Sequence, residues 1–390
     1  AAPVSKKISR EIIRLLSTDS YVFANSSSTH KEGSLAREIV EESRLSIARN
    51  LGVKKDEVIF TSGATESNNL VISGVYDASR KKIKKPHIIT SSIDHSAILE
   101  PFRVLEKKGV KVSLINPNGK QIYPTKEFSD KITEDTILIS ISLVNSELGV
   151  IAPVRDISRA IIEFKKKLGR TIYDYPYIHV DASQAASLIP INPEFHGADF
   201  VTFDAGKMYA LKGVGVVVAL RERKISPISF GGGHEKGLRP GTHNILAIKV
   251  LAIALSEICR TREKEIERQK KLQEFFEYNL KKMFSTCRIN GEGQKRLTSF
   301  VNVCIPGLDA EYAVIQMDSL GVAASSASAC QSAGGMGFSY VVKAIQDGGI
   351  CASSSIRFSM GRDTVKMDIV KAIQALKEVV RLQKVSFALE

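Results

Sequence analysis

The 390-residue sequence contains no long hydrophobic run. Its longest unbroken apolar stretch, Val214 to Leu220, is far too short to span a bilayer. A second candidate, Ile245 to Leu255, is interrupted by Lys249. The N-terminal residues, Ala1-Ala2-Pro3-Val4, are not followed by a basic segment with an apolar h-region. We therefore expect no membrane association and no secretion signal.

Cysteine is scarce, and its spacing excludes the usual cysteine motifs. The five cysteines are Cys259, Cys287, Cys304, Cys330 and Cys351. Their number is odd and no two are close in sequence, which excludes CxxC zinc and redox motifs, so we expect no metal site. A reducing cytoplasm fits this usage best. Most of these cysteines are interpreted as buried apolar fillers, and at most one needs a chemical reason.

The basic charge lacks the pattern of a nucleic-acid-binding protein. Lys+Arg 55 against Asp+Glu 42 gives a net charge of +13. The short basic runs, Arg80 to Lys85 and Lys165 to Lys167, have no interleaved aromatic residues and no recognisable nucleic-acid module. We therefore expect no direct nucleic-acid partner. Repeats and low-complexity tracts are also absent, and with 43% hydrophobic and 25% charged residues the chain has the composition of a globular protein.

Alternation of short β-rich runs with helical patterns between Glu57 and Leu220 predicts an α/β fold. This is a mostly parallel seven-stranded sheet flanked by helices, with strands at Val58 to Thr61, His87 to Ser91, Lys111 to Ile115, Thr136 to Val144, Ile178 to Asp181, Phe200 to Phe203 and Gly215 to Leu220. A long helix from about Asn244 to Met283 leads to a smaller α+β C-terminal domain, with strands near Phe300 to Ile305, Gly321 to Ala324 and Ser355 to Met360. We expect residues 1–15 to pack with that small domain, residues 16–250 to form the large domain and residues 251–390 to form the small one.

Polar clusters follow five of the predicted strands. They are Thr61 to Glu66, Asp94-His95, Asn145 to Glu147, Asp181 to Gln184, and Asp204 to Lys207. Ligands of parallel sheets bind beyond the carboxyl ends of the strands, so these clusters predict one site. The Thr61 to Thr65 turn before a helix could cradle a phosphate. For this segment alone, an ordinary Ser/Thr-capped helix is the favoured interpretation, because such caps are common.

The segment from Phe60 to Asn69 is similar to the signature of cysteine desulfurases, the class-V aminotransferase group of pyridoxal-phosphate (PLP) enzymes. Further segments follow in the family's order over essentially the whole chain: Asn25 to His30, Asp94-His95, Val144 to Gly149, His179 to Gln184, Gly231 to Thr242, Ser325 to Cys330 and Ser355 to Ser359. The resemblance implies the PLP-dependent transferase fold type I. Because Ala1 to Val4 resembles the middle of the family's first motif, we expect a few N-terminal residues to be missing.

The resemblance also implies roles for individual residues. Lys207 looks like the lysine that forms a Schiff base with PLP, although a surface lysine is the alternative. Asp181, at the end of an apolar strand, needs a cation such as the pyridinium. His95 resembles the ring-stacking imidazole that moves protons, with a structural histidine as the alternative. Further expected contacts are Gln184 with the phenolic oxygen, Ala64, Thr65 and Thr242 with the phosphate, Asn25, Asn145 and Arg357 with the substrate, and Cys330 as the sulfur acceptor.

Three departures from the family pattern lie in the expected cofactor site. The family usually has a serine and a histidine before the lysine, where this chain has Asp204 and Gly206. Asp204 would bring a carboxylate near a phosphate, which is costly unless a cation such as Lys236 or Arg239 intervenes. Ser146 replaces an asparagine that would contact the cofactor. Ala210-Leu211 also replaces a Gly-Pro pair before Lys212.

The activity implied by the resemblance is PLP-dependent conversion of L-cysteine to L-alanine. The sulfur would pass to a persulfide on Cys330 and then to an acceptor protein for iron–sulfur clusters or tRNA thiolation, in a cytoplasmic homodimer. The alternatives are a PLP-site-degenerate, weakly active or non-catalytic partner-binding homologue, and a selenocysteine lyase-like enzyme. A serine-enzyme pattern, SxxK at Ser28 to Lys31, is rejected because its SDN and KTG companions are absent.

Overall fold

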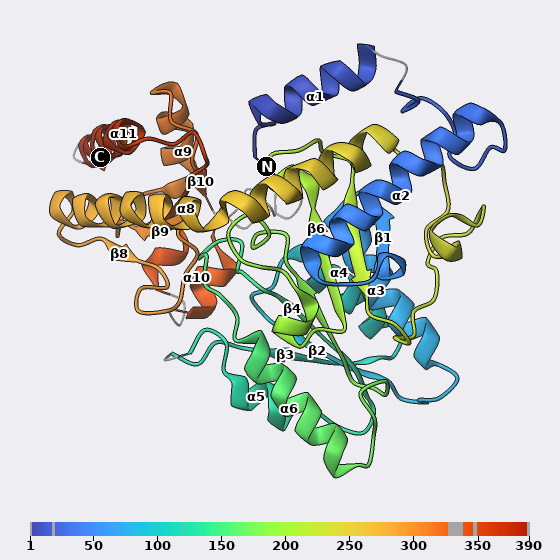
Figure 1. Cartoon of the computed structure of the whole chain (residues 1–390). Coiled ribbons are helices and arrows are strands. Elements are labelled where there is room, and N and C mark those ends of the chain that lie inside the picture. Colours follow the sequence, from blue (N-terminus) through green and yellow to red (C-terminus); the bar gives the residue numbers. More distant parts are fainter. Residues whose placement is uncertain (1, 18–19, 120, 327–337, 346–348, 388–390) are drawn as a thin grey trace. The chain divides into compact units, whose positions relative to one another are not determined.

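The computed structural model describes residues 2–17, 20–119, 121–326, 338–345 and 349–387 (Figure 1). The chain divides into two compact units. We call the first the α/β unit, which comprises Ala1–Ile115, Thr125–Leu143 and Ala152–Arg262. The second, the small unit, comprises Asn116–Pro124, Val144–Ile151 and Glu263–Glu390. The division falls within helix α8, which runs over Ile245–Met283.

A seven-stranded sheet forms the centre of the α/β unit, in the order β1-β7-β6-β5-β4-β2-β3. Its strands are β1 Val58–Thr61, β2 His87–Ser91, β3 Lys111–Ile115, β4 Thr136–Ser142, β5 Tyr177–Asp181, β6 Phe200–Asp204 and β7 Gly215–Ala219. Strands β2 to β6 pair in parallel, whereas β7 is antiparallel to both β6 and β1. Every residue of β4 and β5 is buried, as expected for parallel strands covered on both faces. The predicted sheet is confirmed.

Helices flank this sheet (Figure 1). The helices of the α/β unit, besides the first part of α8, are α1 Lys6–Ser17, α2 Lys31–Leu51, α3 Ala64–Ser79, α4 Ser96–Lys107, α5 Thr125–Asp130, α6 Val154–Lys167 and α7 Pro193–His196. Leu70 and Val71 of α3 and Phe102 of α4 pack in one buried cluster with Ile88 of β2 and Leu138 of β4. Burial of these large apolar side chains, at roughly 1.5–3 kcal/mol each, holds the helices on the sheet.

A close backbone approach places the turn before α3 beside the end of β6. Gly215 of β7 lies opposite both Thr61 of β1 and Asp204 of β6. A Cβ atom at Gly215 would lie only 2.6 Å from the carbonyl carbon of Gly63, so only glycine fits here. The amino end of α3 and the carboxyl end of β6 are thereby adjacent.

The small unit contains a four-stranded antiparallel sheet in the order β10-β11-β9-β8. Its strands are β8 Arg288–Ile289, β9 Phe300–Cys304, β10 Ser325–Ser326 and β11 Ser355–Ser359, and its helices besides α8 are α9 Ala310–Ser319, α10 Tyr340–Ile345 and α11 Lys366–Phe387. The α+β prediction is confirmed, but the strand expected at Gly321 to Ala324 is wrong. Gly321 has φ +77° and Val322 N–H bonds back to the Met317 carbonyl, so this segment closes α9 instead.

Cys304 and Cys351 form a disulfide within the small unit. Both are fully buried, and their Cα atoms lie 5.2 Å apart. Both cysteines are buried as expected, but the expectation that at most one cysteine needs a chemical reason is wrong for this bonded pair. Strand pairing places Ser355 opposite Cys304, and this brings the preceding turn with Cys351 close to β9. Cys259 and Cys287 are half-buried free thiols. Cys330 lies outside the described residues.

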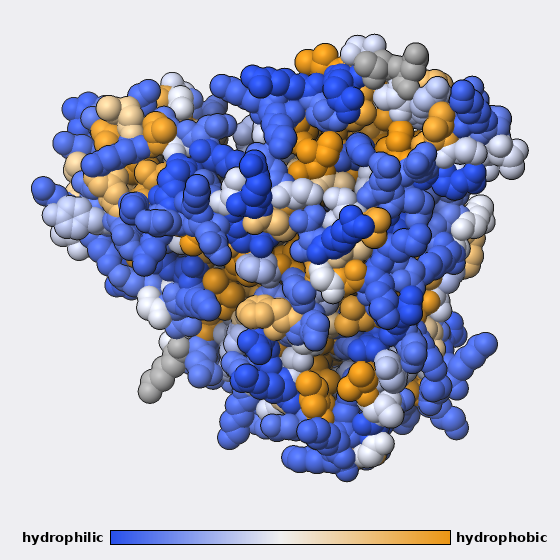
Figure 2. All heavy atoms as spheres, viewed as in Figure 1, coloured by the Kyte–Doolittle hydropathy of each residue, from blue (hydrophilic) through white to orange (hydrophobic). Residues whose placement is uncertain are grey.

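The face seen in Figure 2 is mostly hydrophilic, with apolar side chains gathered in the region of α1. Ile13 and Leu16 of this helix are 67% and 65% exposed. At the start of the chain, Ala2 and Ser5 N–H groups donate to the carbonyls of Gly206 and Tyr209. In the part of the chain that the structure describes, no helix combines the length and apolarity needed to cross a membrane.

Candidate active site

A chain of buried hydrogen bonds runs through the α/β unit and ends on the carboxylate of Asp181. Asn68 Nδ2 donates to Asp181 Oδ2 over 2.7 Å, and Thr202 Oγ1 donates to Asn68 Oδ1 over 2.6 Å. His179 continues the chain, with Nε2 3.0 Å from Thr202 Oγ1 and Nδ1 2.8 Å from Ser140 Oγ. The four side chains leading to Asp181 are all 0% exposed. The chain therefore links α3 with three neighbouring strands.

This hydrogen-bond chain has one direction. Burial lowers the pKa of His179 to about 4, so the imidazole is neutral at pH 7 and has one donor and one acceptor nitrogen. The single hydroxyl proton of Thr202 goes to Asn68, so Thr202 accepts from His179 Nε2 and His179 Nδ1 accepts from Ser140. Every proton in the chain thus points toward Asp181. The Ser183 N–H also donates to Asp181 Oδ1, over 2.9 Å, and together these contacts fix the carboxylate's orientation.

His95 lies close enough to Lys207 and Asp181 for both of their charges to act on its imidazole. Burial lowers the pKa of His95, while the charge of Asp181 opposes this shift and the charge of Lys207 adds to it. His95 precedes the first turn of α4, where its Nδ1 accepts a hydrogen bond from the Ala97 N–H over 3.1 Å. Neutral His95 therefore carries its proton on Nε2. The three residues that the sequence placed at separate strand ends are brought together.

Asp94 fixes the position of His95. Its carboxylate accepts hydrogen bonds from the Ser142 N–H, the Ser91 N–H and the Thr90 hydroxyl, at 2.9, 3.2 and 2.8 Å. Burial raises the pKa of Asp94 to about 6, and these hydrogen bonds oppose the shift. Because Ser142 ends β4, the loop that carries His95 is tied to the neighbouring strand.

Further predicted cofactor residues of the α/β unit lie after β6, at the amino end of α3 and after β5. Gly206 and Lys207 lie in the 3-10 turn Ala205–Lys207, directly after Asp204 at the end of β6. Ala64 and Thr65 are the first two residues of α3, and Gln184 lies in the loop after β5. The amino end of α3 already has a hydrogen-bond acceptor, because the Ala64 N–H donates to Asp204 Oδ2 over 3.4 Å.

The residues present fit the ring of the cofactor that the sequence resemblance implies. Asp181 is a buried carboxylate, 7% exposed, whose described hydrogen bonds come from the Asn68 amide and the Ser183 N–H. Such a group calls for a cation, which a protonated pyridine nitrogen supplies. Lys207 provides the amine and His95 a proton-carrying imidazole in the same neighbourhood. The phosphate end differs, because Asp204 places a carboxylate there.

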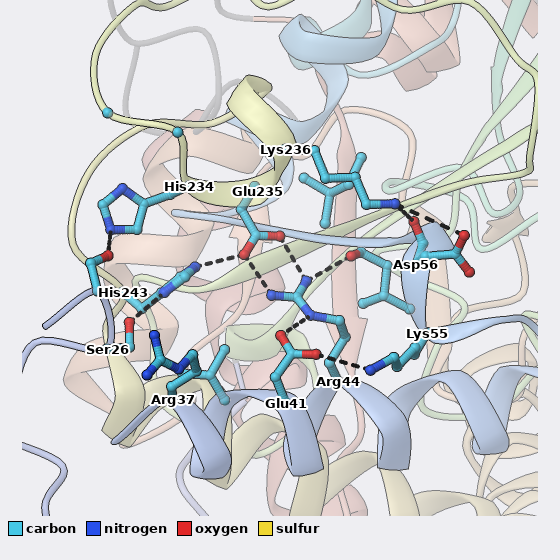
Figure 3. Close-up of a pocket in the computed structure, with 16 residues that line it drawn as sticks. Ser26, Arg37, Glu41, Arg44, Lys55, Asp56, His234, Glu235, Lys236 and His243 are labelled. Atoms are coloured by element: carbon cyan, nitrogen blue, oxygen red, sulfur yellow. Dashed lines mark hydrogen bonds and ion pairs between the residues drawn. The ribbon is translucent and has the colours of Figure 1, made fainter. Parts of the chain in front are cut away.

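A buried ion pair anchors the loop from Gly231 to His243, which carries Thr242 (Figure 3). Glu235 accepts hydrogen bonds from Arg44 Nη1 and Nη2 at 2.8 and 2.7 Å, from the Phe60 N–H at 2.9 Å and from His243 Nε2 at 2.6 Å. Glu235, Arg44 and His243 line a cavity of about 640 Å³. Glu235 adopts φ +50° and the next residue φ +59°, a left-handed conformation that costs non-glycine residues energy. The ion pair offsets this strain and holds the loop.

Two predicted substrate residues and Ser146 belong to the small unit. Asn145 Oδ1 accepts from the N–H groups of Glu147 and Leu148, each at 3.0 Å. Arg357 Nη1 donates to the Ser146 carbonyl over 2.8 Å, whereas its buried Nε has no partner among the described residues. An unsatisfied buried guanidinium donor is suited to a carboxylate ligand.

Glu147 lies beside these residues in the small unit. Burial raises the pKa of its carboxyl group to about 7, against the opposing effects of a hydrogen bond from Ser339 and the charge of Arg357. Asn25 and Thr242, by contrast, are exposed residues of the α/β unit, and Asn25 forms a turn by accepting from the Ser27 N–H over 3.0 Å. Their roles stay predictions, as does that of Cys330.

Sequence reasoning missed the residues that orient Asp181. A signal was available in the alternation of polar residues within otherwise apolar strands: Ser140 and Ser142 in β4, His179 and Asp181 in β5, Thr202 and Asp204 in β6. Alternate residues of a strand share one face, so this pattern predicts a polar stripe at the strand ends. Glu235 and Arg44 gave no such signal, because they are 191 residues apart.

We predict that Thr202→Val destabilises the protein by about 2–3 kcal/mol, because it leaves Asn68 Oδ1 and His179 Nε2 without partners in the buried chain. Thr202→Ser is the matched control, since it keeps the hydroxyl and loses only a methyl group, at a cost of about 1 kcal/mol. Urea unfolding of both variants measures the difference. Equal stability of the two variants would contradict the buried chain.

Glu235→Gln should lower the free energy of unfolding by about 3 kcal/mol at pH 7, since it leaves Arg44 buried without a full counter-charge. The contacts lower the pKa of Glu235 to about 2 from its usual 4.5, with hydrogen bonds from Arg44 and His243 overcoming burial. A depressed carboxyl pKa stabilises the fold above pH 4.5, and the contribution is lost as the pH falls toward 2. The difference between wild type and variant should therefore shrink over that range.

The control is Glu41→Gln, which removes a 44%-exposed partner of the same Arg44. Its cost should stay below about 1 kcal/mol, as for other exposed pairs. Denaturant unfolding at several pH values tests both variants. If Glu41→Gln cost as much as Glu235→Gln, the buried ion pair would not be the anchor of the loop.

Comparison with known proteins places this fold and site in one family. The family model for class-V aminotransferases matches residues 5–371. The curated "Cysteine desulfurase IscS" of Dictyoglomus turgidum is 36% identical over 92% of this chain and 88% of its own length, and "Cysteine desulfurase IscS 1" of Archaeoglobus fulgidus is 33% identical over 93% and 92%.

Solved structures agree with this assignment. A NifS-like protein from Rickettsia africae is 27% identical, with a TM-score of 0.83 over 97% of each chain. The solved structure of "SspA in complex with cysteine" is 27% identical with a TM-score of 0.74, over 94% of this chain and 98% of that one. The sequence resemblance is confirmed, and the chain belongs to the cysteine desulfurase family of class-V aminotransferases.

Proposed function

We propose that this chain is a PLP-dependent cysteine desulfurase that converts L-cysteine to L-alanine and passes the sulfur to a persulfide on its own Cys330. The observation that carries the proposal is that Asp181 ends β5 while Lys207 and His95 follow the carboxyl ends of β6 and β2, with both charges acting on His95. The cysteine desulfurase relatives support the reaction type, and the relative solved with bound cysteine supports the substrate. The final acceptor would be a protein of iron–sulfur cluster or tRNA-thiolation type, and the assembly a homodimer.

When bound, PLP supplies an electron sink for the bonds of the substrate amino acid. Lys207 would hold it covalently, and Asp181, oriented by Asn68 and the Ser183 N–H, would face its pyridine nitrogen. Neutral His95 carries a proton on Nε2, because its Nδ1 is engaged by the Ala97 N–H. That nitrogen is the group available to give and take the protons of the reaction.

Arg357 is the proposed clamp for the substrate carboxylate. One end of its guanidinium is fixed on the Ser146 carbonyl, which leaves the buried Nε as a donor for a ligand. A planar guanidinium suits a carboxylate better than an ammonium group does. Cys330 would then take up the sulfur. Its thiolate forms a bond to the substrate sulfur as the bond from that sulfur to carbon breaks, so that alanine leaves after the carbon is protonated.

One observation favours a second candidate, a homologue that binds PLP weakly. It is the carboxylate of Asp204 at the amino end of α3, where the family pattern places a neutral serine. This candidate predicts no cofactor band under ordinary loading conditions.

The test of the proposed function is the visible absorption spectrum of the protein incubated with PLP. A band should form in the wild type, be absent in Lys207→Ala and change when L-cysteine is added. Lys212→Ala, at an exposed lysine close by in sequence, is the matched control and should keep the band. Absence of a band in the wild type, or its survival in Lys207→Ala, would contradict the proposal.

A further inference from the structure

Asp204 lies where an anion would meet the amino end of α3. It ends β6 opposite Gly215, and the turn at Gly63 packs directly on that glycine. A Cβ atom at Gly63 would lie 3.1 Å from Asp204 Oδ2, which shows how closely the carboxylate approaches the turn. The backbone N–H of Ala64 points to the same oxygen, at 3.4 Å.

Two carboxylates of the chain itself accept hydrogen bonds from the N–H groups of this turn. Asp204 accepts from Ala64, and Glu66 Oε2 accepts from the Ser62 N–H over 2.7 Å. Helix amino ends attract anions through these free N–H groups and through the helix dipole. Here the chain's own carboxylates occupy N–H groups that would otherwise be available to an external anion.

The carboxylate at position 204 and the glycine at position 206 depend on each other sterically. A Cβ atom at Gly206 would lie 2.9 Å from Asp204 Oδ1 and 3.2 Å from Lys212 Cγ. The carboxylate therefore fills the space that a side chain at position 206 would need. The two departures from the family pattern before Lys207 are one structural change.

The two cations that the sequence offered for compensation are engaged elsewhere. Arg239 Nε donates to Glu66 Oε1 over 2.9 Å. Lys236 Nζ donates to the Asp56 carbonyl over 2.6 Å. Neither of these contacts neutralises Asp204.

We propose that Asp204 is an intramolecular competitor of the cofactor's phosphate. The phosphate group therefore adds less to the binding affinity for PLP than it would without this carboxylate. The proposal rests on the proposed function, since it takes PLP as the cofactor. The phosphate must displace Asp204 from Ala64 or bind beside its negative charge, and both cost affinity. Pyridoxal, which has the same ring and aldehyde without the phosphate, does not meet this cost. Asp204 thereby sets the preference between the phosphorylated and unphosphorylated forms.

The experiment measures equilibrium dissociation constants of PLP and pyridoxal for the full-length protein, from the Lys207-dependent absorption band. The variants are Asp204→Ser, Asp204→Asn, which removes the charge and keeps the shape, and Asp77→Ser, which removes an exposed charge from the far end of α3. Both Asp204 variants should bind PLP at least about tenfold more tightly than wild type and pyridoxal within about twofold. Asp77→Ser should match wild type for both ligands.

Inorganic phosphate gives a second readout that needs no cofactor. It should raise the melting temperature of Asp204→Ser more than that of the wild type, because it stabilises whichever protein binds it. Equal PLP affinity in wild type and both Asp204 variants would overturn the proposal while leaving the desulfurase function intact. An equal gain for pyridoxal and PLP would overturn it too. If no protein forms a Lys207-dependent band with either ligand, the proposed function fails and this inference fails with it.

Discussion

The directed chain of hydrogen bonds from Ser140 to Asp181 is the constraint on which the site depends. It crosses three parallel strands and reaches α3, so the position of the Asp181 carboxylate is fixed by the sheet register rather than by a loop. A buried polar chain of this kind is stabilising only when every member is satisfied. Neutral His179 satisfies that condition, because it accepts at one nitrogen and donates at the other.

The same principle recurs at the other buried carboxylates of the α/β unit. Asp94 accepts hydrogen bonds from Ser142, Ser91 and Thr90 and ties the loop of His95 to β4, and Glu235 accepts four hydrogen bonds and holds the loop of Thr242. The half-buried carboxylate of Asp204 differs, since its described contact is one long hydrogen bond to a helix end. A weakly held carboxylate at an anion-binding position is more easily displaced than one inside a closed network.

The sequence was sufficient for the sheet and for the clusters at its edge, because parallel strands are continuous apolar runs and their carboxyl ends share one edge. It was not sufficient to predict the contacts that orient the side chains of these clusters. Asn68 reaches Asp181 only through packing of α3 on the sheet, and Glu235 meets Arg44 across 191 residues. The Cys304–Cys351 bridge likewise depends on the β9–β11 register, which no local pattern encodes.

Transfer of sulfur from L-cysteine to the chain's own thiol can be measured by mass spectrometry of the peptide that contains Cys330. The protein is loaded with PLP, incubated with L-cysteine and alkylated before digestion. We expect the added mass of one sulfur atom on Cys330, and we expect it to be absent from Lys207→Ala and from protein given L-serine. Unmodified Cys330 in the wild type would contradict this transfer. Undiminished formation of protein-bound persulfide in Cys330→Ala would contradict it as well.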